Sequence, residues 1–127
     1  MDITTIIEIT TRLFVAVILG GALGIERTIV GRNAGLKTYS LVSLGSALFV
    51  MISLETVPLF ASFPGFNPIM MASQIIVGVG FLGAGMVIFQ QSKVQGLTTA
   101  AGLWVSSGLG MAAGFGFYGE ALIAALL

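Results

Sequence analysis

The groups that could carry chemistry in this sequence are five carboxylates, spread singly along the chain. The 127 residues include no cysteine and no histidine. This excludes thiol nucleophiles and disulfides, and removes the commonest general base and most zinc sites. No nucleophile–base pair or phosphate-binding loop is visible, so we expect neither an enzyme nor a cofactor. The sequence defines no metal site. The carboxylates are Asp2, Glu8, Glu26, Glu55 and Glu120.

The charged pair Glu26-Arg27 follows a long apolar segment. Arg27 suits the C-terminal end of a helix, but Glu26 would face the negative end of the helix dipole. We therefore expect a basic partner for Glu26, with Arg32 and Lys37 the nearest in sequence. Two interpretations stay open here: an ion-pair cluster that fixes the following loop, or a binding site for a ligand or a partner protein.

Three uncharged polar residues are further candidates for a functional site. Thr98 and Thr99 follow Gly96-Leu97 and are good N-cap residues for a helix. The alternative is a helix N-terminus that is open to an anion. Gln74 lies in an apolar segment, where a polar side chain needs a reason.

The composition indicates that lipid surrounds the chain. Hydrophobic residues make up 57% and charged residues 8%, with a mean hydropathy of +1.09, whereas soluble domains carry roughly 25% charged residues. The net charge is zero, so no basic face indicates nucleic-acid binding.

Four apolar segments approach the roughly 20 residues that a helix needs to cross a bilayer. Backbone groups in lipid need internal hydrogen bonds, so each segment is predicted to be a helix. The final residues, EALIAALL, are too few to span and predict a truncated fifth helix or a surface segment. The predicted fold is an all-α, polytopic transmembrane helical bundle. Its spans are residues 5–25, 38–57, 69–89 and 98–117.

The basic residues predict the orientation in the membrane. Three lie in the loop 26–37 and Lys93 lies in the loop 90–95, whereas the loop 58–68 has none. The positive-inside rule places the two basic loops in the cytoplasm, with the N-terminus and the loop 58–68 outside. Arg12 is the exception. It can pair with Glu8 one helical turn earlier or extend outward.

Small residues recur at a spacing of four in three of the predicted helices. In lipid, such residues let helices approach closely and pack. Packing within one chain and contact between copies are both open, and a pore lined by backbone is a third alternative. The Gly-x-Gly-x-x-Gly pattern from Gly78 lies inside a span, so it does not indicate dinucleotide binding. The packing candidates are Gly20 and Gly24, then Gly80, Gly83 and Gly85, then Gly110 and Gly114.

Four blocks of the chain stand out: GIER at 24–27, RNAGLKT at 32–38, QIIVGVGFLGAG at 74–85 and the segment 96–105. Together they resemble the MgtC/SapB family of bacterial membrane proteins. GIER, at 24–27, resembles the end of that family's first helix, and RNAGLKT, at 32–38, resembles its R-x-A-G-L-R-T. QIIVGVGFLGAG, at 74–85, resembles its Q-V-V-S-G-I-G-F-L-G-A-G. The segment 96–105 resembles G-L-T-T-A-A-x-L-W-V. The blocks follow in order across nearly the whole chain.

The chain also departs from that family. Asn67 and Met70 stand where the family usually has an acid and a base, a joint loss that is expected if the two pair. Lys37 stands where arginine is preferred, and lysine lacks the planar fork of arginine. Family members often add a fifth helix and a cytoplasmic regulatory domain. We expect this chain to lack both and to form one domain over residues 1–127.

The resemblance implies a bacterial inner-membrane protein connected with growth under magnesium limitation. Because no carboxylate lies at mid-bilayer on this topology, we expect it to act by binding other membrane proteins, and to form a homo-oligomer. The alternative is a transporter or channel for magnesium or another ion, formed between protomers. Its flux would depend on Glu26 or Glu55.

Overall fold

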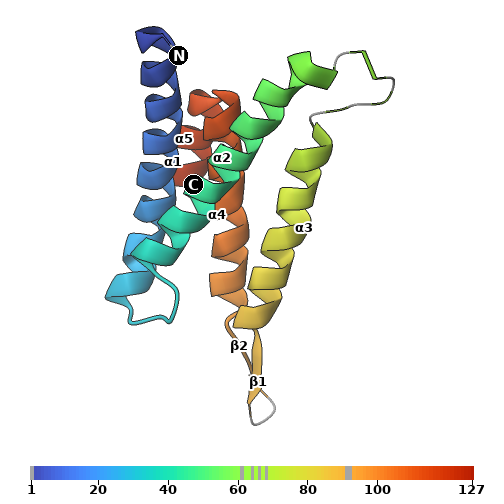
Figure 1. Cartoon of the computed structure of the whole chain (residues 1–127). Coiled ribbons are helices and arrows are strands. Elements are labelled where there is room, and N and C mark those ends of the chain that lie inside the picture. Colours follow the sequence, from blue (N-terminus) through green and yellow to red (C-terminus); the bar gives the residue numbers. More distant parts are fainter. Residues whose placement is uncertain (1, 61, 64, 66, 68, 91–92) are drawn as a thin grey trace.

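The computed structural model describes residues 2–60, 62–63, 65, 67, 69–90 and 93–127. The described part contains five helices and one two-stranded hairpin (Figure 1). In chain order the elements are α1 (Ile3–Ile29), α2 (Leu36–Phe60), α3 (Ile69–Met86), β1 (Ile88–Gln90), β2 (Lys93–Gln95), α4 (Leu97–Phe115) and α5 (Tyr118–Leu126). The predicted helical bundle is confirmed.

Three helices of the described residues, α1, α2 and α3, are long and apolar enough to cross a membrane. They correspond to the first three predicted spans. The fourth predicted span corresponds to α4, which has 19 residues but is not among the three. Its many glycine, serine and threonine residues dilute its apolar residues.

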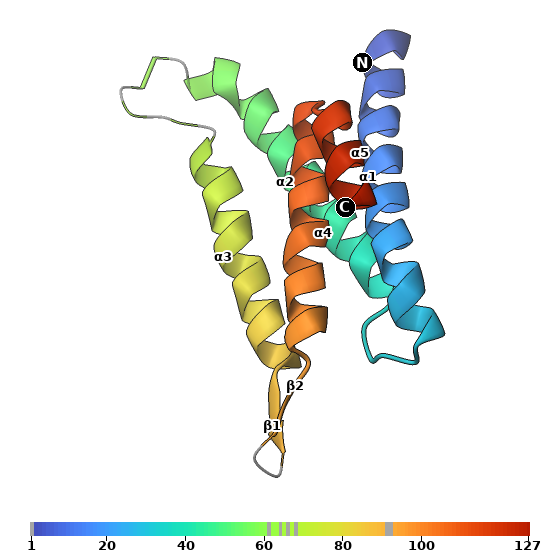
Figure 2. The same cartoon turned by 180° about the vertical axis from the view of Figure 1, so that it is seen from behind.

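The helix α4 is the centre of the bundle and contacts all four other helices. α2 runs obliquely across it, and α1 and α3 lie on opposite sides (Figures 1 and 2). α2 and α3 separate toward the end of the bundle away from their connection, where α2 begins beside α1 and α3 ends beside α4 (Figures 1 and 2). α3 is therefore held mainly through α4.

α1 and α2 each extend beyond the predicted spans at both ends. α1 starts after Asp2, whose side chain accepts a hydrogen bond from the Thr5 backbone N–H at 3.1 Å, and hydrogen bonds from Thr5 lower the pKa of Asp2. α1 also runs through Glu26 and Arg27 to Ile29. α2 continues through Pro58 to Phe60, and the proline removes one backbone donor from the last turn of the helix.

The third predicted span was too long at its C-terminal end. α3 ends at Met86, and Ile88 begins a strand in which Phe89 pairs with Val94 in antiparallel register. Val87 and Ile88 are β-branched, which favours extended backbone. The hairpin lies in the predicted cytoplasmic loop 90–95, of which residues 91 and 92 lie outside the described part. It places the end of α3 beside the start of α4.

The final helix is short and turns back onto the bundle. Gly116 has φ +85° and ends α4, so α5 packs its buried Ala121 against Leu19 and Leu109. Nine residues reach only about half of a bilayer at roughly 1.5 Å per residue. This fits the predicted fifth helix that is too short to span.

Candidate functional site

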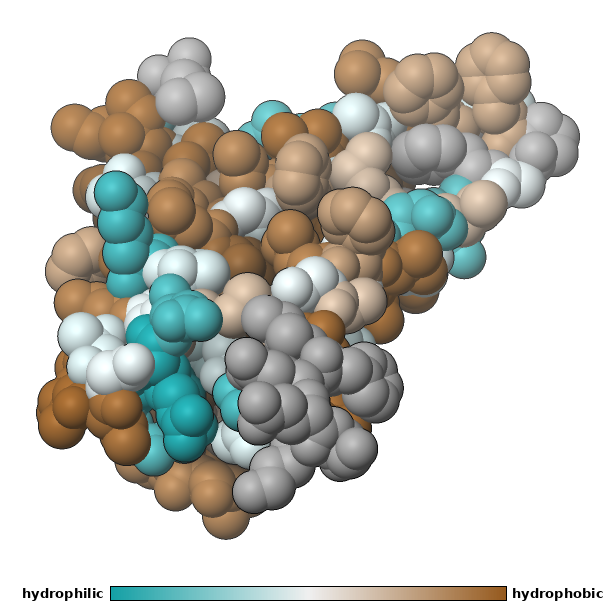
Figure 3. Space-filling model, turned by 90° about the horizontal axis from the view of Figure 1, so that it is seen from below, coloured by the Kyte–Doolittle hydropathy of each residue, from teal (hydrophilic) through white to brown (hydrophobic). Residues whose placement is uncertain are grey.

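Four of the seven polar residues predicted to form a site line one pocket. Arg27 and Arg32 come from the end of α1 and the loop after it, and Thr98 and Thr99 come from the first turn of α4. The pocket has a volume of about 480 Å³. We call it the basic pocket. In the view from below, hydrophilic surface gathers over this end of the bundle, with apolar surface beside it (Figure 3).

Glu26 pairs with Arg27, its neighbour in sequence, and not with the expected Arg32 or Lys37. The Arg27 guanidinium donates a hydrogen bond to Glu26 at 2.6 Å. The prediction was wrong because α1 continues past both residues, which keeps them on one helical turn and away from the loop. The side chain of Arg27 is 19% exposed and that of Glu26 is 69% exposed, so the carboxylate faces outward.

Neither Thr98 nor Thr99 caps α4, contrary to the prediction. The N-cap is Gly96, with φ +88° and no side-chain hydrogen bond to the helix start. A Cβ at this position would overlap the Met86 carbonyl oxygen, so the close return of the hairpin requires glycine. The helix therefore begins two residues earlier than a threonine cap would place it, and both threonines lie within its first turn.

The start of α2 differs from the start of α4. The Leu36 backbone N–H, at the first position of α2, donates to the Thr28 hydroxyl at 2.8 Å, so a side chain from α1 caps that helix. In α4 no N-cap side chain accepts such a bond, and the first helical bond runs from the Ala100 N–H to the Gly96 carbonyl oxygen, at 2.9 Å. The backbone donors of Leu97, Thr98 and Thr99 have no intrahelical acceptor, and all three residues line the basic pocket.

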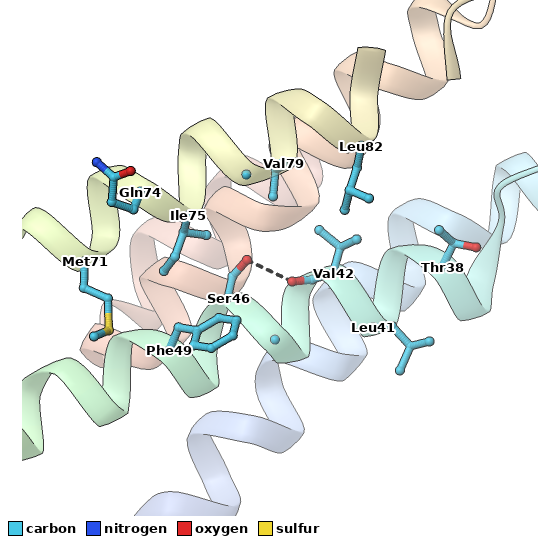
Figure 4. Close-up of a pocket in the computed structure, with 12 residues that line it drawn as sticks. Thr38, Leu41, Val42, Ser46, Phe49, Met71, Gln74, Ile75, Val79 and Leu82 are labelled. Carbon is cyan, nitrogen blue, oxygen red and sulfur yellow. Dashed lines mark hydrogen bonds between the residues drawn. The ribbon is translucent and has the colours of Figure 1, made fainter. Parts of the chain in front are cut away.

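Lys37 and Gln74 lie outside this pocket. Lys37 is exposed near the start of α2. Gln74 lies beside a groove of about 620 Å³ between α2 and α3. In the close-up, Ile75 and Val79 of α3 and Val42 of α2 point into the groove, and the Gln74 amide points away from it (Figure 4). Gln74 forms no hydrogen bond with another described residue.

The predicted glycine contacts of the first and fourth spans pack within the chain. A Cβ at Gly20 would lie 2.5 Å from the Ser43 Cβ, and one at Gly24 would lie 2.7 Å from the Leu36 Cα. On α4, a Cβ at Gly110 would overlap the Ser43 carbonyl oxygen, and one at Gly114 would lie 2.8 Å from that of Ala47. These glycines let α1 and α4 approach α2 from two sides.

The glycines of α3 behave differently. Only Gly83 is near another helix, with its Cβ position 3.6 Å from that of Ala100. Gly78, Gly80 and Gly85 have no described atom of another segment within 4 Å of a Cβ position. Helical spacing places Gly78 and Gly85 on the flank that faces the groove and Gly80 on the other flank. Most of the predicted packing surface of α3 is therefore uncovered.

Sequence reasoning missed Tyr39, which links the centre of the bundle to the basic pocket. The side chain is 1% exposed, and its hydroxyl donates to the Thr99 carbonyl oxygen at 3.2 Å. The Ser106 hydroxyl donates to the Tyr39 carbonyl oxygen at 2.8 Å. Gly102 was the sequence signal for this contact, because a Cβ at that position would overlap the Tyr39 hydroxyl. The spacing of the glycines alone does not show which side chain a given glycine makes room for.

Long apolar helices, packed through glycine and small hydroxyl side chains, define this chain as a polytopic helical membrane protein. The profile of the MgtC family matches residues 13–127. The chain therefore belongs to the MgtC family, and the resemblance seen in the sequence is confirmed.

The chain is similar to several curated relatives. It is 42% identical over 113 residues to YhiD of Escherichia coli (strain K12), which is named as a candidate magnesium transporter, covering 87% of this chain and 53% of that protein. It is 41% identical over 115 residues to the protein MgtC of Salmonella typhimurium (strain LT2), covering 91% and 47%. An uncharacterized protein of Haemophilus influenzae is 33% identical over 123 residues, covering 94% and 52%. The chain thus spans about half the length of these relatives. No solved structure matches it.

Proposed function

We propose that this protein serves bacterial adaptation to magnesium limitation from the inner membrane, by packing its α2–α3 groove against a helix of another membrane protein. The observation that carries the proposal is the open groove. Gly45 of α2 and Gly78 of α3 both line it, and neither has a described atom of another segment within 4 Å of a Cβ position. The link to magnesium rests on membership of the MgtC family and on the name of the relative YhiD.

The physical basis is the cost of glycine and its use in lipid. A glycine inside a helix costs about 1 kcal/mol relative to alanine, which close backbone approach can offset. Gly20 and Gly110 are used in this way inside the bundle, whereas Gly45 and Gly78 are not. A helix seated in the groove would give them the same use.

The proposed topology adds α4 as a fourth span. Its 19 residues extend about 28 Å at roughly 1.5 Å per residue, close to the thickness of the hydrocarbon core. The hydroxyl groups in the middle of α4 face inward, since Ser106 and Ser107 are buried, so its modest hydropathy does not put these polar groups in lipid. The loops 26–37 and 90–95 are then cytoplasmic, with the N-terminus outside.

The test is cross-linking of the Gly78→Ile variant in membranes. A Cβ at Gly78 meets no described atom of another segment within 4 Å, and the rest of the added side chain projects into the groove. We therefore expect the bundle to stay intact and the cross-linked product to be lost. Gly80→Ile is the matched control, because it makes the same change on the other flank of α3. Undiminished cross-linking in Gly78→Ile would contradict the groove as the contact. Identification of the product distinguishes a foreign helix from a second copy, the expected homo-oligomer.

A magnesium pathway between protomers is the second candidate, and the name of the relative YhiD favours it. The described residues contain no group of three or more acidic, histidine or cysteine side chains that could hold a metal ion, so a site would need groups from two copies. Purified protein in liposomes would then carry magnesium flux that falls in Glu26→Gln or Glu55→Gln. Flux no higher than in empty liposomes would exclude this function.

A further inference from the structure

The basic pocket combines features that favour an anion. Its lining residues include two arginines and no carboxylate. Arg27 has one partner, Glu26, and a guanidinium carries five N–H donors, so donors remain. Arg32 is exposed and forms no ion pair with a described residue. Asn33 and Gln95 add amide donors to the same pocket.

The first turn of α4 adds a second kind of donor. The backbone N–H groups of Leu97, Thr98 and Thr99 have no acceptor among the described residues. They lie at the positive end of a helix of 19 residues, where an anion is stabilised. No acidic residue lies in this first turn. Helix N-termini of this kind often satisfy these donors with a side chain, as Thr28 does for α2.

A buried hydroxyl at the same place gives independent support for a ligand. Thr99 is 5% exposed, and its hydroxyl forms no hydrogen bond with another described residue. Among the described residues, two polar side-chain atoms are fully enclosed and lack a partner, Arg12 Nε and Ser43 Oγ. The Thr99 hydroxyl is not one of them, so it is not fully enclosed. It therefore reaches open space, and the space that Thr99 lines is the basic pocket. A largely buried hydroxyl that has no described partner and opens into the pocket is free to donate to a ligand bound there.

We propose that the basic pocket binds a phosphate group. Phosphate offers several strong acceptor oxygens, which suit both the planar fork of arginine and the N–H groups of a helix start. The volume of about 480 Å³ leaves room for whatever carries the phosphate. The carrier is a phospholipid headgroup or a free phosphate compound. This site goes beyond the proposed function, because it lies at the loop end of the bundle and does not involve the groove.

The experiment uses the whole chain, purified in a neutral detergent, with inorganic phosphate and short-chain phosphatidic acid as separate probes. Phosphorus-31 NMR line broadening measures the binding of each. We expect the wild type to bind at least one probe. Arg32→Gln should weaken this binding by about tenfold or more, since hydrogen bonds to charged groups are the strong ones. Thr99→Val, which keeps the volume and the charge, should weaken it by roughly threefold.

Lys37→Gln is the matched control, because it removes the same charge from an exposed residue that does not line the pocket. Its binding should stay within about twofold of the wild type, since exposed charges are screened. Binding of phosphatidic acid alone identifies a lipid headgroup, and binding of inorganic phosphate identifies a free compound. Binding of neither probe, or equal losses in Arg32→Gln and Lys37→Gln, would overturn the proposal. Cross-linking through the groove, measured on the same Arg32→Gln protein, stays unchanged and reports on the proposed function separately.

Discussion

Gly110 is the position at which the approach of α4 to α2 depends most directly on a missing side chain. Alanine there would place its Cβ against the Ser43 carbonyl oxygen, which is backbone and cannot turn aside. We expect Gly110→Ala to lower the free energy of unfolding in detergent by about 1–3 kcal/mol through overpacking. Thermal unfolding followed by circular dichroism measures this effect.

Gly108 provides the comparison, two residues away on the same helix. It has no described atom of another segment within 4 Å of its Cβ position. Gly108→Ala should therefore be neutral, or stabilise by up to about 1 kcal/mol through helix propensity. Equal effects of the two substitutions would mean that α2 and α4 are not in close contact at Gly110.

At the scale of single residues, the sequence predicted contacts within one turn but not those between helices. The pairing of Arg12 with Glu8, at a spacing of four, was one of two alternatives for Arg12 and is present. The partner of Glu26 was predicted wrongly, because that prediction depended on where α1 ends. The position of Tyr39 beside Thr99 joins residues 60 apart, and periodicity within either helix carries no information about it.

Arg12 connects two elements, the N-terminal half of α1 and the C-terminal end of α4. Its guanidinium donates to Glu8 and, at 2.6 Å, to the Gly114 carbonyl oxygen. That carbonyl lies in the last turn of α4, where a cation is favoured. We expect Arg12→Gln to cost about 1.5–3 kcal/mol, as measured for hydrogen bonds to charged groups.

The effect of Arg12→Gln should be local to the turn between α4 and α5. Backbone amide exchange of Gly116 and Phe117 measures it, since both amides donate to the last turn of α4, and their exchange should become faster. Lys37→Gln, at the far end of α2, serves as the control and should leave these amides unchanged. Slow exchange preserved in Arg12→Gln would show that α5 is held by its apolar contacts alone.

The elements themselves were largely predictable, and the reasons for the exceptions are physical. Long apolar runs in lipid have to be helices, so the first three spans were found to within a few residues at most boundaries. The hairpin of β1 and β2 was not, because each strand has only three residues and sits between apolar segments. The N-cap of α4 was predicted at a threonine and is Gly96. The same glycine is required by the close return of the hairpin to Met86, which the sequence did not reveal.

Over the whole molecule, the spacing of the glycines predicted that helices approach each other but not which helices do so. The stripes of α1 and α4 are used within the chain, while most of that of α3 is not. The sequence likewise could not predict that the residues of the basic pocket lie together. Its arginines and threonines are about 70 residues apart in the chain, and only the packing of α1 beside α4 and the return of the hairpin bring them together.

The proposed orientation of the molecule can be tested with cysteine labelling, because the chain contains no cysteine. Lys37→Cys places a thiol at the loop end of the bundle that holds the basic residues, and Phe63→Cys places one in the connection between α2 and α3; both positions are exposed. Basic loops stay in the cytoplasm. A membrane-impermeant maleimide should therefore label Phe63→Cys in cells with a permeabilised outer membrane, and label Lys37→Cys only after the inner membrane is disrupted. The reverse pattern would invert the topology and place the basic pocket outside the cell, whereas labelling of both in intact inner membranes would mean that α2 does not cross the bilayer.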